Sequence, residues 1–110
     1  MAYDEDLADR IRAEVAGEKN LTEMKMFGGL AFLIGGHMAV AASGQGGLML
    51  RCDPDESAEL VKEPGVSRME MRGREMDGWL RVTSAAVADD EALQRWVDVG
   101  TSYAATLPPK

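Results

Sequence analysis

Apolar residues recur with a helical period at the start of the chain. Leu7, Ile11 and Val15 are spaced four residues apart, so they line one side of a helix over residues 4–16. Three acidic residues open this helix, where its dipole favours negative charge, and Gly17 is a suitable stop. The pattern predicts an amphipathic first helix whose acidic start is explained without a metal ion.

The segment from residue 24 to residue 34 alternates like a strand instead. One side would carry Met24, Met26, Leu30, Phe32 and Ile34, and the other Phe27, Ala31 and Leu33. Gly28-Gly29 interrupts the alternation, which predicts a bulge or a close backbone approach, because glycine has no Cβ atom. Gly35-Gly36 then supplies the positive φ angles of a two-residue hairpin turn.

Two more strands and a helix follow this turn. Residues 37–43 and 48–52 predict the second and third strands, joined by a glycine-rich turn. Asp53 is a suitable N-cap and Pro54 a suitable first helical residue. We expect the second helix to run from there to about Glu63.

The remaining third of the chain predicts a second hairpin. Met69 and Met71 alternate with charged residues in a strand over 68–72. A turn near 74–78 would then lead into a strand over 79–83.

A final helix completes the predicted order. Asp89 or Asp90 would cap it, and its inward face would carry Leu93, Trp96, Val97, Gly100, Ala104 and Leu107. The elements then follow as α-β-β-β-α-β-β-α, which predicts an α+β fold in two layers, with helices on an antiparallel five-stranded sheet. We expect residues 1–110 to form a single domain.

Charge and cysteine content narrow the classes of function. Nineteen acidic and twelve basic side chains give a net charge of -7, which repels nucleic acid and anionic membranes. We therefore expect neither direct nucleic-acid binding nor membrane association. Cys52 is the only cysteine, which excludes an intramolecular disulfide and suits a reducing compartment. The N-terminus is acidic where a signal peptide would be basic, so we expect a cytoplasmic location.

The glycine-rich residues 44–47 invite comparison with phosphate-binding loops. They precede a strand pattern, whereas dinucleotide-binding and P-loop motifs open a helix. We therefore interpret them as a hairpin turn.

His37 and Cys52 are the two side chains that come nearest to candidate catalytic groups. His37 is the only histidine and lies beside a hairpin turn without a partner motif, which favours a structural role. Cys52 follows Arg51 and precedes a helix start, both of which favour the thiolate, but a small buried thiol is the commoner state of such a residue. The sequence predicts no catalytic residue, metal site or cofactor.

Methionine is unusually abundant, with eight residues. Six fall on predicted strands, namely Met24, Met26, Met38, Met49, Met69 and Met71. Methionine adapts its shape to its neighbours, so such residues serve in a core or on a partner-binding face. We take Met69, Met71 and Trp79 as the candidate interface, with core packing as the alternative.

The residues that begin the first hairpin carry a family resemblance. Together with Gly78-Trp79 and the ending Leu107-Pro108-Pro109-Lys110, this region resembles the TfoX N-terminal domain family, whose signature here is Met26, Phe27, Gly28 and Gly29. The resemblance implies a fold like that of the type III secretion chaperones and a link to bacterial regulators of natural competence, in which a second domain follows. Because the sequence ends at Lys110, we expect a stand-alone form of the domain. The resemblance implies no catalytic residues.

Two functions remain open at this point. The first is a non-catalytic regulatory or protein-interaction domain, with an unidentified protein partner or a second copy of itself as a homodimer. The alternative is a small ligand-binding domain or enzyme with a pocket near Cys52, His37 or the second hairpin.

Overall fold

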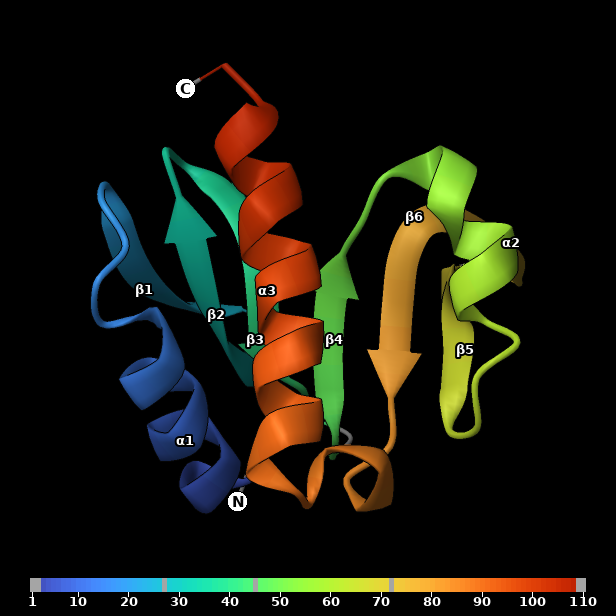
Figure 1. Ribbon diagram of the computed structural model, residues 1–110, viewed down its shortest axis with the longest axis horizontal. Helices are drawn as coiled ribbons and strands as arrows, with labels where there is room; N and C mark the ends of the chain where they lie inside the picture. The colour runs from blue at the N-terminus through green and yellow to red at the C-terminus, as the bar shows by residue number, and fades with distance from the viewer. Residues whose placement is uncertain (1–2, 27, 45, 72, 109–110) are drawn as a thin grey trace.

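The computed structural model describes residues 3–26, 28–44, 46–71 and 73–108. Its elements are α1 (Glu5–Val15), β1 (Leu21–Met26), β2 (Gly29–Ile34), β3 (His37–Ala42), β4 (Leu48–Arg51), the 3-10 helix η1 (Pro54–Glu56), α2 (Ser57–Leu60), β5 (Val66–Met71), β6 (Arg74–Val82), the 3-10 helix η2 (Ala85–Val87) and α3 (Asp90–Thr106). Figure 1 shows the helices on the viewer's side of the sheet. The α+β class is therefore confirmed.

The described residues form one antiparallel sheet of six strands in the order β1-β2-β3-β4-β6-β5. The prediction of a five-stranded sheet with the element order α-β-β-β-α-β-β-α was therefore wrong by one strand. The predicted first strand over residues 24–34 is in fact two strands, because the chain turns at Gly28, whose φ is 75°. A residue with a Cβ atom is strained at that angle, so glycine permits this turn.

The turn also changes which residues share a face. Met24 pairs with Ala31, and Phe32 pairs with Glu23. Paired residues of antiparallel strands point to the same side, and neighbours along a strand point to opposite sides. Met24 therefore lies on the face opposite to Phe32, and its predicted grouping with Leu30 and Phe32 is wrong.

Strands β5 and β6 form the second hairpin, but its turn comes earlier than predicted. Gly73, with φ of 79°, precedes the start of β6 at Arg74, so residues 74–78 belong to a strand rather than to a turn. Gly78 lies inside β6, where the register shifts and residues 77–79 bulge out of the pairing with β5. A bulge bends the strand and redirects the side chains beside it.

The first and last helices have the predicted start and inward face. The Asp4 side chain accepts a hydrogen bond from the Leu7 N–H at 3.2 Å, and Asp89 accepts one from the Glu91 N–H at 3.0 Å. Their buried residues are Leu7, Ala8, Ile11 and Val15 in α1, and Leu93, Trp96, Val97, Gly100, Thr101 and Ala104 in α3. Leu107, predicted to continue the face of α3, follows the helix and is half-buried.

The second helix starts where expected and is shorter than expected. The Asp53 side chain accepts a hydrogen bond from the Asp55 N–H at 2.9 Å, which caps η1. The chain then continues as α2 and leaves the helix after Leu60 rather than at Glu63. The short η2 was not predicted.

The main core lies between the helices and the sheet. It contains Phe32 of β2 and Ile11 of α1, both fully buried, and Leu60 of α2 packs against it. Helix α3 approaches β3 closely at Gly100, where a Cβ atom would lie 2.4 Å from the Ala39 carbonyl oxygen. Since α1, α2 and α3 all pack on this side, the described helices leave the opposite side of the sheet uncovered.

Candidate functional site

The side of the sheet that faces away from the helices carries a second apolar cluster. Its buried members are Ala31, Leu33, Met38, Ala41 and Met49, against which Met69 and Trp79 pack. Strand pairing adds Met24, opposite Ala31, and Met76, opposite Met69. We call the surface formed by these nine residues the open sheet face.

Methionine dominates the open sheet face. Met24, Met38, Met49, Met69 and Met76 come from five different strands. Met76 was not predicted to lie on this face, because it fell within the predicted turn. A strand that begins at Arg74 would have placed Met76 on one face by its period-two alternation. Strand pairing therefore gathers methionines that are scattered along the sequence.

The side chains of the open sheet face differ in how much of their surface is exposed to solvent. Met38 and Met49 are only 8% and 9% exposed, although no described helix lies over them, so neighbouring side chains cover them. Met69 and Trp79 are half-buried, and Met24 is 49% exposed. The face thus has a packed centre on β3 and β4 and accessible apolar side chains on the strands to either side.

Two of the three candidate interface residues lie together here. Met69 and Trp79 both pack against the buried members of the open sheet face. Met71 is the last residue of β5 and pairs with Arg74, but its side chain lies outside the described structure.

The charged residues at strand positions of this face are arginines. Arg81 pairs with Met49, Arg51 pairs with Trp79, and Arg74 lies two residues before Met76 on the same strand. No acidic residue occupies a described strand position of the face, although the whole chain has a net charge of -7. The local charge is therefore opposite in sign to that of the whole protein.

Arg51 connects this face to the helix layer at the end of β4. Its guanidinium carbon lies 5.0 Å from the centroid of the Trp79 ring and 5.7 Å from that of Tyr103 in α3. Both distances suit a cation–π interaction. Arg51 therefore contacts Trp79 on the open sheet face and Tyr103 in the helix layer.

The bulge in β6 fixes the backbone beside Trp79. The Gly78 N–H donates a hydrogen bond to the Ser57 hydroxyl at 2.6 Å, and the Cys52 N–H donates one to the Gly78 carbonyl oxygen at 2.8 Å. Gly78 has a φ of 85°, which favours glycine. These contacts anchor the bulge to the segment that follows β4.

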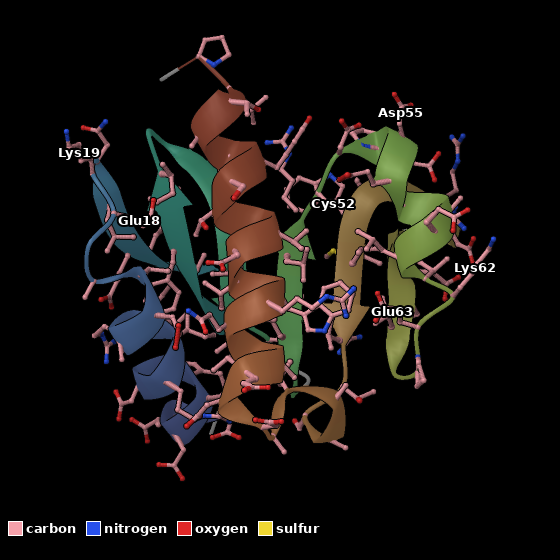
Figure 2. The ribbon with its side chains drawn as sticks, viewed as in Figure 1. Glu18, Lys19, Cys52, Asp55, Lys62 and Glu63 are labelled. Carbon is pink, nitrogen blue, oxygen red and sulfur yellow. The ribbon has the colours of Figure 1, made fainter. Side chains whose placement is uncertain are left out.

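Cys52 is fully buried in the main core. Figure 2 shows its side chain in the interior, between β4 and β6. Burial raises the pKa of the thiol above its ordinary value, and the nearby Glu56 and Asp53 carboxylates act in the same direction. The Ser57 hydroxyl, 3.8 Å from Sγ, only partly offsets this shift. The interpretation of Cys52 as a small buried thiol fits these surroundings, whereas a reactive thiolate does not.

His37 lies at the start of β3 in a different environment. Its Nε2 atom is 2.7 Å from the carbonyl oxygen of Pro108, which follows α3. This contact connects the start of β3 to the segment that follows α3, which is a structural role for the histidine. No group of three or more histidine, cysteine, aspartate or glutamate side chains in the described part of the chain is placed to hold a metal ion.

The described residues of the family signature, Met26, Gly28 and Gly29, lie where β1 ends and β2 begins. Gly29 is closely approached, since a Cβ atom there would lie 2.3 Å from the Ala42 carbonyl oxygen. The prediction of a close backbone approach is therefore confirmed at Gly29, while Gly28 provides the turn. Met26 ends β1, and Phe27 lies outside the described residues.

Two concave features adjoin the segments proposed for the alternative function. One, of about 440 Å³, lies between α3 and η1, and Cys52 does not line it; its residues are Asp53, Glu56, Arg95, Asp98, Val99, Ser102, Tyr103 and Thr106. The other, of about 300 Å³, adjoins the second hairpin and includes Ser67 and Arg81.

Sequence comparison identifies the family of the chain. The TfoX N-terminal domain family matches residues 13–104, which is most of the chain. The chain belongs to the TfoX N-terminal domain family. No curated protein and no solved structure is significantly similar to it, so the expected likeness to type III secretion chaperones stays a prediction. None of the described helices has the length and apolar character that crossing a membrane requires.

Proposed function

We propose that this chain is a non-catalytic, regulatory protein-interaction domain that binds a partner protein through the open sheet face. The observation that carries the proposal is the collection of five methionines and Trp79 on the side of the sheet that the described helices leave uncovered. Methionine, tryptophan and arginine are enriched in protein interfaces, and methionine adapts to irregular partner surfaces.

The charges of this face indicate the chemistry of the partner. Arg51, Arg74 and Arg81 favour an apolar surface bordered by acidic side chains. A homodimer with two open sheet faces in contact would bring like charges together, which is unfavourable. We therefore favour a different protein over a second copy of this chain.

The alternative function has weaker support. An enzyme built on Cys52 would need an accessible thiolate, but this thiol is buried and its pKa is raised. His37 contacts Pro108 rather than a second catalytic group. We place the binding function in the cytoplasm, which a free thiol supports.

Affinity capture with matched variants tests this proposal. Met69→Glu adds a negative charge to the open sheet face, and Ser102→Glu adds the same charge to an exposed position of α3. We expect wild type and Ser102→Glu to retain one protein in stoichiometric amounts from a native lysate, and Met69→Glu to lose it. Equal retention by all three folded proteins, or by none, would contradict the proposal.

A further inference from the structure

A cavity lies where three strands of the sheet meet their loops. Leu48 at the start of β4 pairs with Val82 at the end of β6, which pairs with Val66 at the start of β5. The loops beside these ends border an open cavity of about 300 Å³, lined by Gly46, Gly47, Gly65, Ser67, Arg81, Val82, Thr83 and Ser84.

The lining has an unusual composition for this protein. It contains one arginine, three hydroxyl side chains and three glycines, with Val82 as its single apolar side chain. None of the eight residues is acidic, although the chain has nineteen acidic side chains. Hydroxyl and guanidinium groups donate hydrogen bonds, so the cavity suits an anion.

Arg81 is positioned at this cavity by its neighbours. It pairs with Ser67 across the β5–β6 ladder, and its Nη2 lies 3.4 Å from the Gly46 carbonyl oxygen. A guanidinium has five N–H donors in a planar fork, so it can contact the turn and a bound anion together. Arg81 would supply the positive charge of the site.

The glycines keep the cavity open. At Gly47, with φ of 78°, a Cβ atom would lie 2.6 Å from the Val82 carbonyl oxygen. At Gly65, with φ of 79°, it would lie 2.7 Å from the Thr83 hydroxyl. Any side chain at these positions would strain the backbone and crowd the wall.

We propose that this cavity binds a small phosphate compound, either inorganic phosphate or a phosphate monoester. The hydroxyl and guanidinium groups that line the cavity come from β5, β6 and the loop after β6, so an anion with four oxygens can accept from more of them than a carboxylate with two. A nucleic-acid backbone is disfavoured, because the net charge of the protein repels a polyanion. The interpretation of residues 44–47 as a hairpin turn is unaffected, because Gly46 and Gly47 line the cavity together with residues of β5 and β6.

Nuclear magnetic resonance titration tests the proposal directly. The full chain, labelled with nitrogen-15, is titrated with inorganic phosphate, and separately with acetate and with chloride at equal ionic strength. We expect saturable shifts with phosphate, centred on the amides of Gly46, Gly47, Gly65, Ser67 and Ser84. Shifts that do not saturate, or that acetate and chloride reproduce, would overturn the assignment.

Matched arginine variants identify the charged group. Arg81→Gln should weaken phosphate binding about tenfold or more, because it removes a charge-assisted hydrogen bond. Arg74→Gln removes the same charge from β6 outside the cavity and should bind as wild type does. Ser67→Ala should weaken binding severalfold without changing the charge. Equal affinity of all four proteins would refute the site.

Phosphoserine titrated in the same way distinguishes the two ligand sources. Tighter binding of phosphoserine than of inorganic phosphate would identify a monoester, and the reverse order would identify free phosphate. Either order supports the site, whereas absence of saturable binding by both compounds contradicts it. Failure of this site and failure of partner binding are distinguishable, because phosphate binding is measured without a partner and Met69 does not line the cavity.

Discussion

The buried hydroxyl of Ser57 accepts a hydrogen bond from the backbone N–H of Gly78 at 2.6 Å. These two residues are 21 positions apart in the sequence, yet this contact joins the start of α2 to the bulge of β6. Because Trp79 follows directly, the contact helps to determine how the open sheet face is assembled.

Removal of the Ser57 hydroxyl should destabilise the fold. Ser57→Ala leaves the buried Gly78 N–H without its acceptor, so we expect the free energy of unfolding to fall by about 1–3 kcal/mol. Urea denaturation measures the change. Ser102→Ala removes a hydroxyl from an exposed position of α3 and should stay within about 0.5 kcal/mol of wild type. Equal stability of both variants would show that the Ser57–Gly78 contact contributes nothing.

Gly100 should behave in the opposite way to an ordinary glycine in a helix. Alanine usually improves a helix interior by about 0.5–1 kcal/mol. At Gly100, however, its Cβ atom would lie 2.4 Å from the Ala39 carbonyl oxygen and 2.7 Å from Val40 Cγ1. We expect Gly100→Ala to lower stability by about 1–3 kcal/mol, because α3 must move away from β3.

Gly17 is the matched control for this substitution. A Cβ atom at this position would meet no described residue within 4 Å beyond its chain neighbours, and the φ of Gly17 is not in the left-handed region. Gly17→Ala should therefore leave thermal stability unchanged or slightly raised. A stabilising effect of Gly100→Ala would mean that α3 does not pack closely on β3.

The Cys52 thiol should make stability depend on pH in the alkaline range. The pKa of this thiol is raised in the folded protein, so the unfolded chain loses the proton first as the pH rises. Its contribution is fully present below the ordinary thiol pKa of 9.0 and is lost as the pH rises through the folded-state value. Denaturation at several pH values should show a steeper alkaline loss for wild type than for Cys52→Ala. Parallel curves would indicate an unshifted thiol.

The two sides of the sheet should respond differently to truncation. Phe32→Ala removes a fully buried ring from the main core and should cost about 3–5 kcal/mol. Met24→Ala, on the adjacent strand but on the opposite face and 49% exposed, should change stability by less than about 0.5 kcal/mol. Similar losses at the two positions would contradict the assignment of faces.

Elements with a strong local signal were predictable from the sequence. The periodic apolar residues of α1 and α3 identify both helices, and Asp53-Pro54 identifies the start of η1. The Gly35-Gly36 turn was also confirmed, since their φ angles are 59° and 89°. In each case the residues that determine the structure are neighbours in the chain.

Two other glycines show where local reasoning fails. Gly28 was expected in a bulge or at a close backbone approach and lies in a turn, whereas Gly78 was expected at a turn and lies in a bulge. Both have a positive φ, 75° and 85°, so residue type does not distinguish the two structures. At Gly78, contacts with Cys52 and Ser57, distant in the sequence, accompany the bulge.

The candidate site was predictable in composition but not in arrangement. Met24, Met38, Met49 and Met69 were recognised on strands, together with Trp79, whereas Met76 fell within the predicted turn. Their common face depends on the register of five strands, in which the turn at Gly28 determines the pairing of β1 with β2 and the bulge at Gly78 shifts the pairing of β5 with β6. The positions of Arg51, Arg74 and Arg81 on this face depend on the same strand register.

Site-specific photo-crosslinking tests most directly whether the open sheet face binds a partner. A benzophenone amino acid is placed at position 69 on this face, and in a second protein at position 102 on the exposed side of α3. After irradiation in the native lysate, we expect one discrete adduct from position 69 and none from position 102. An adduct from position 102 alone, or no adduct from position 69, would contradict the account.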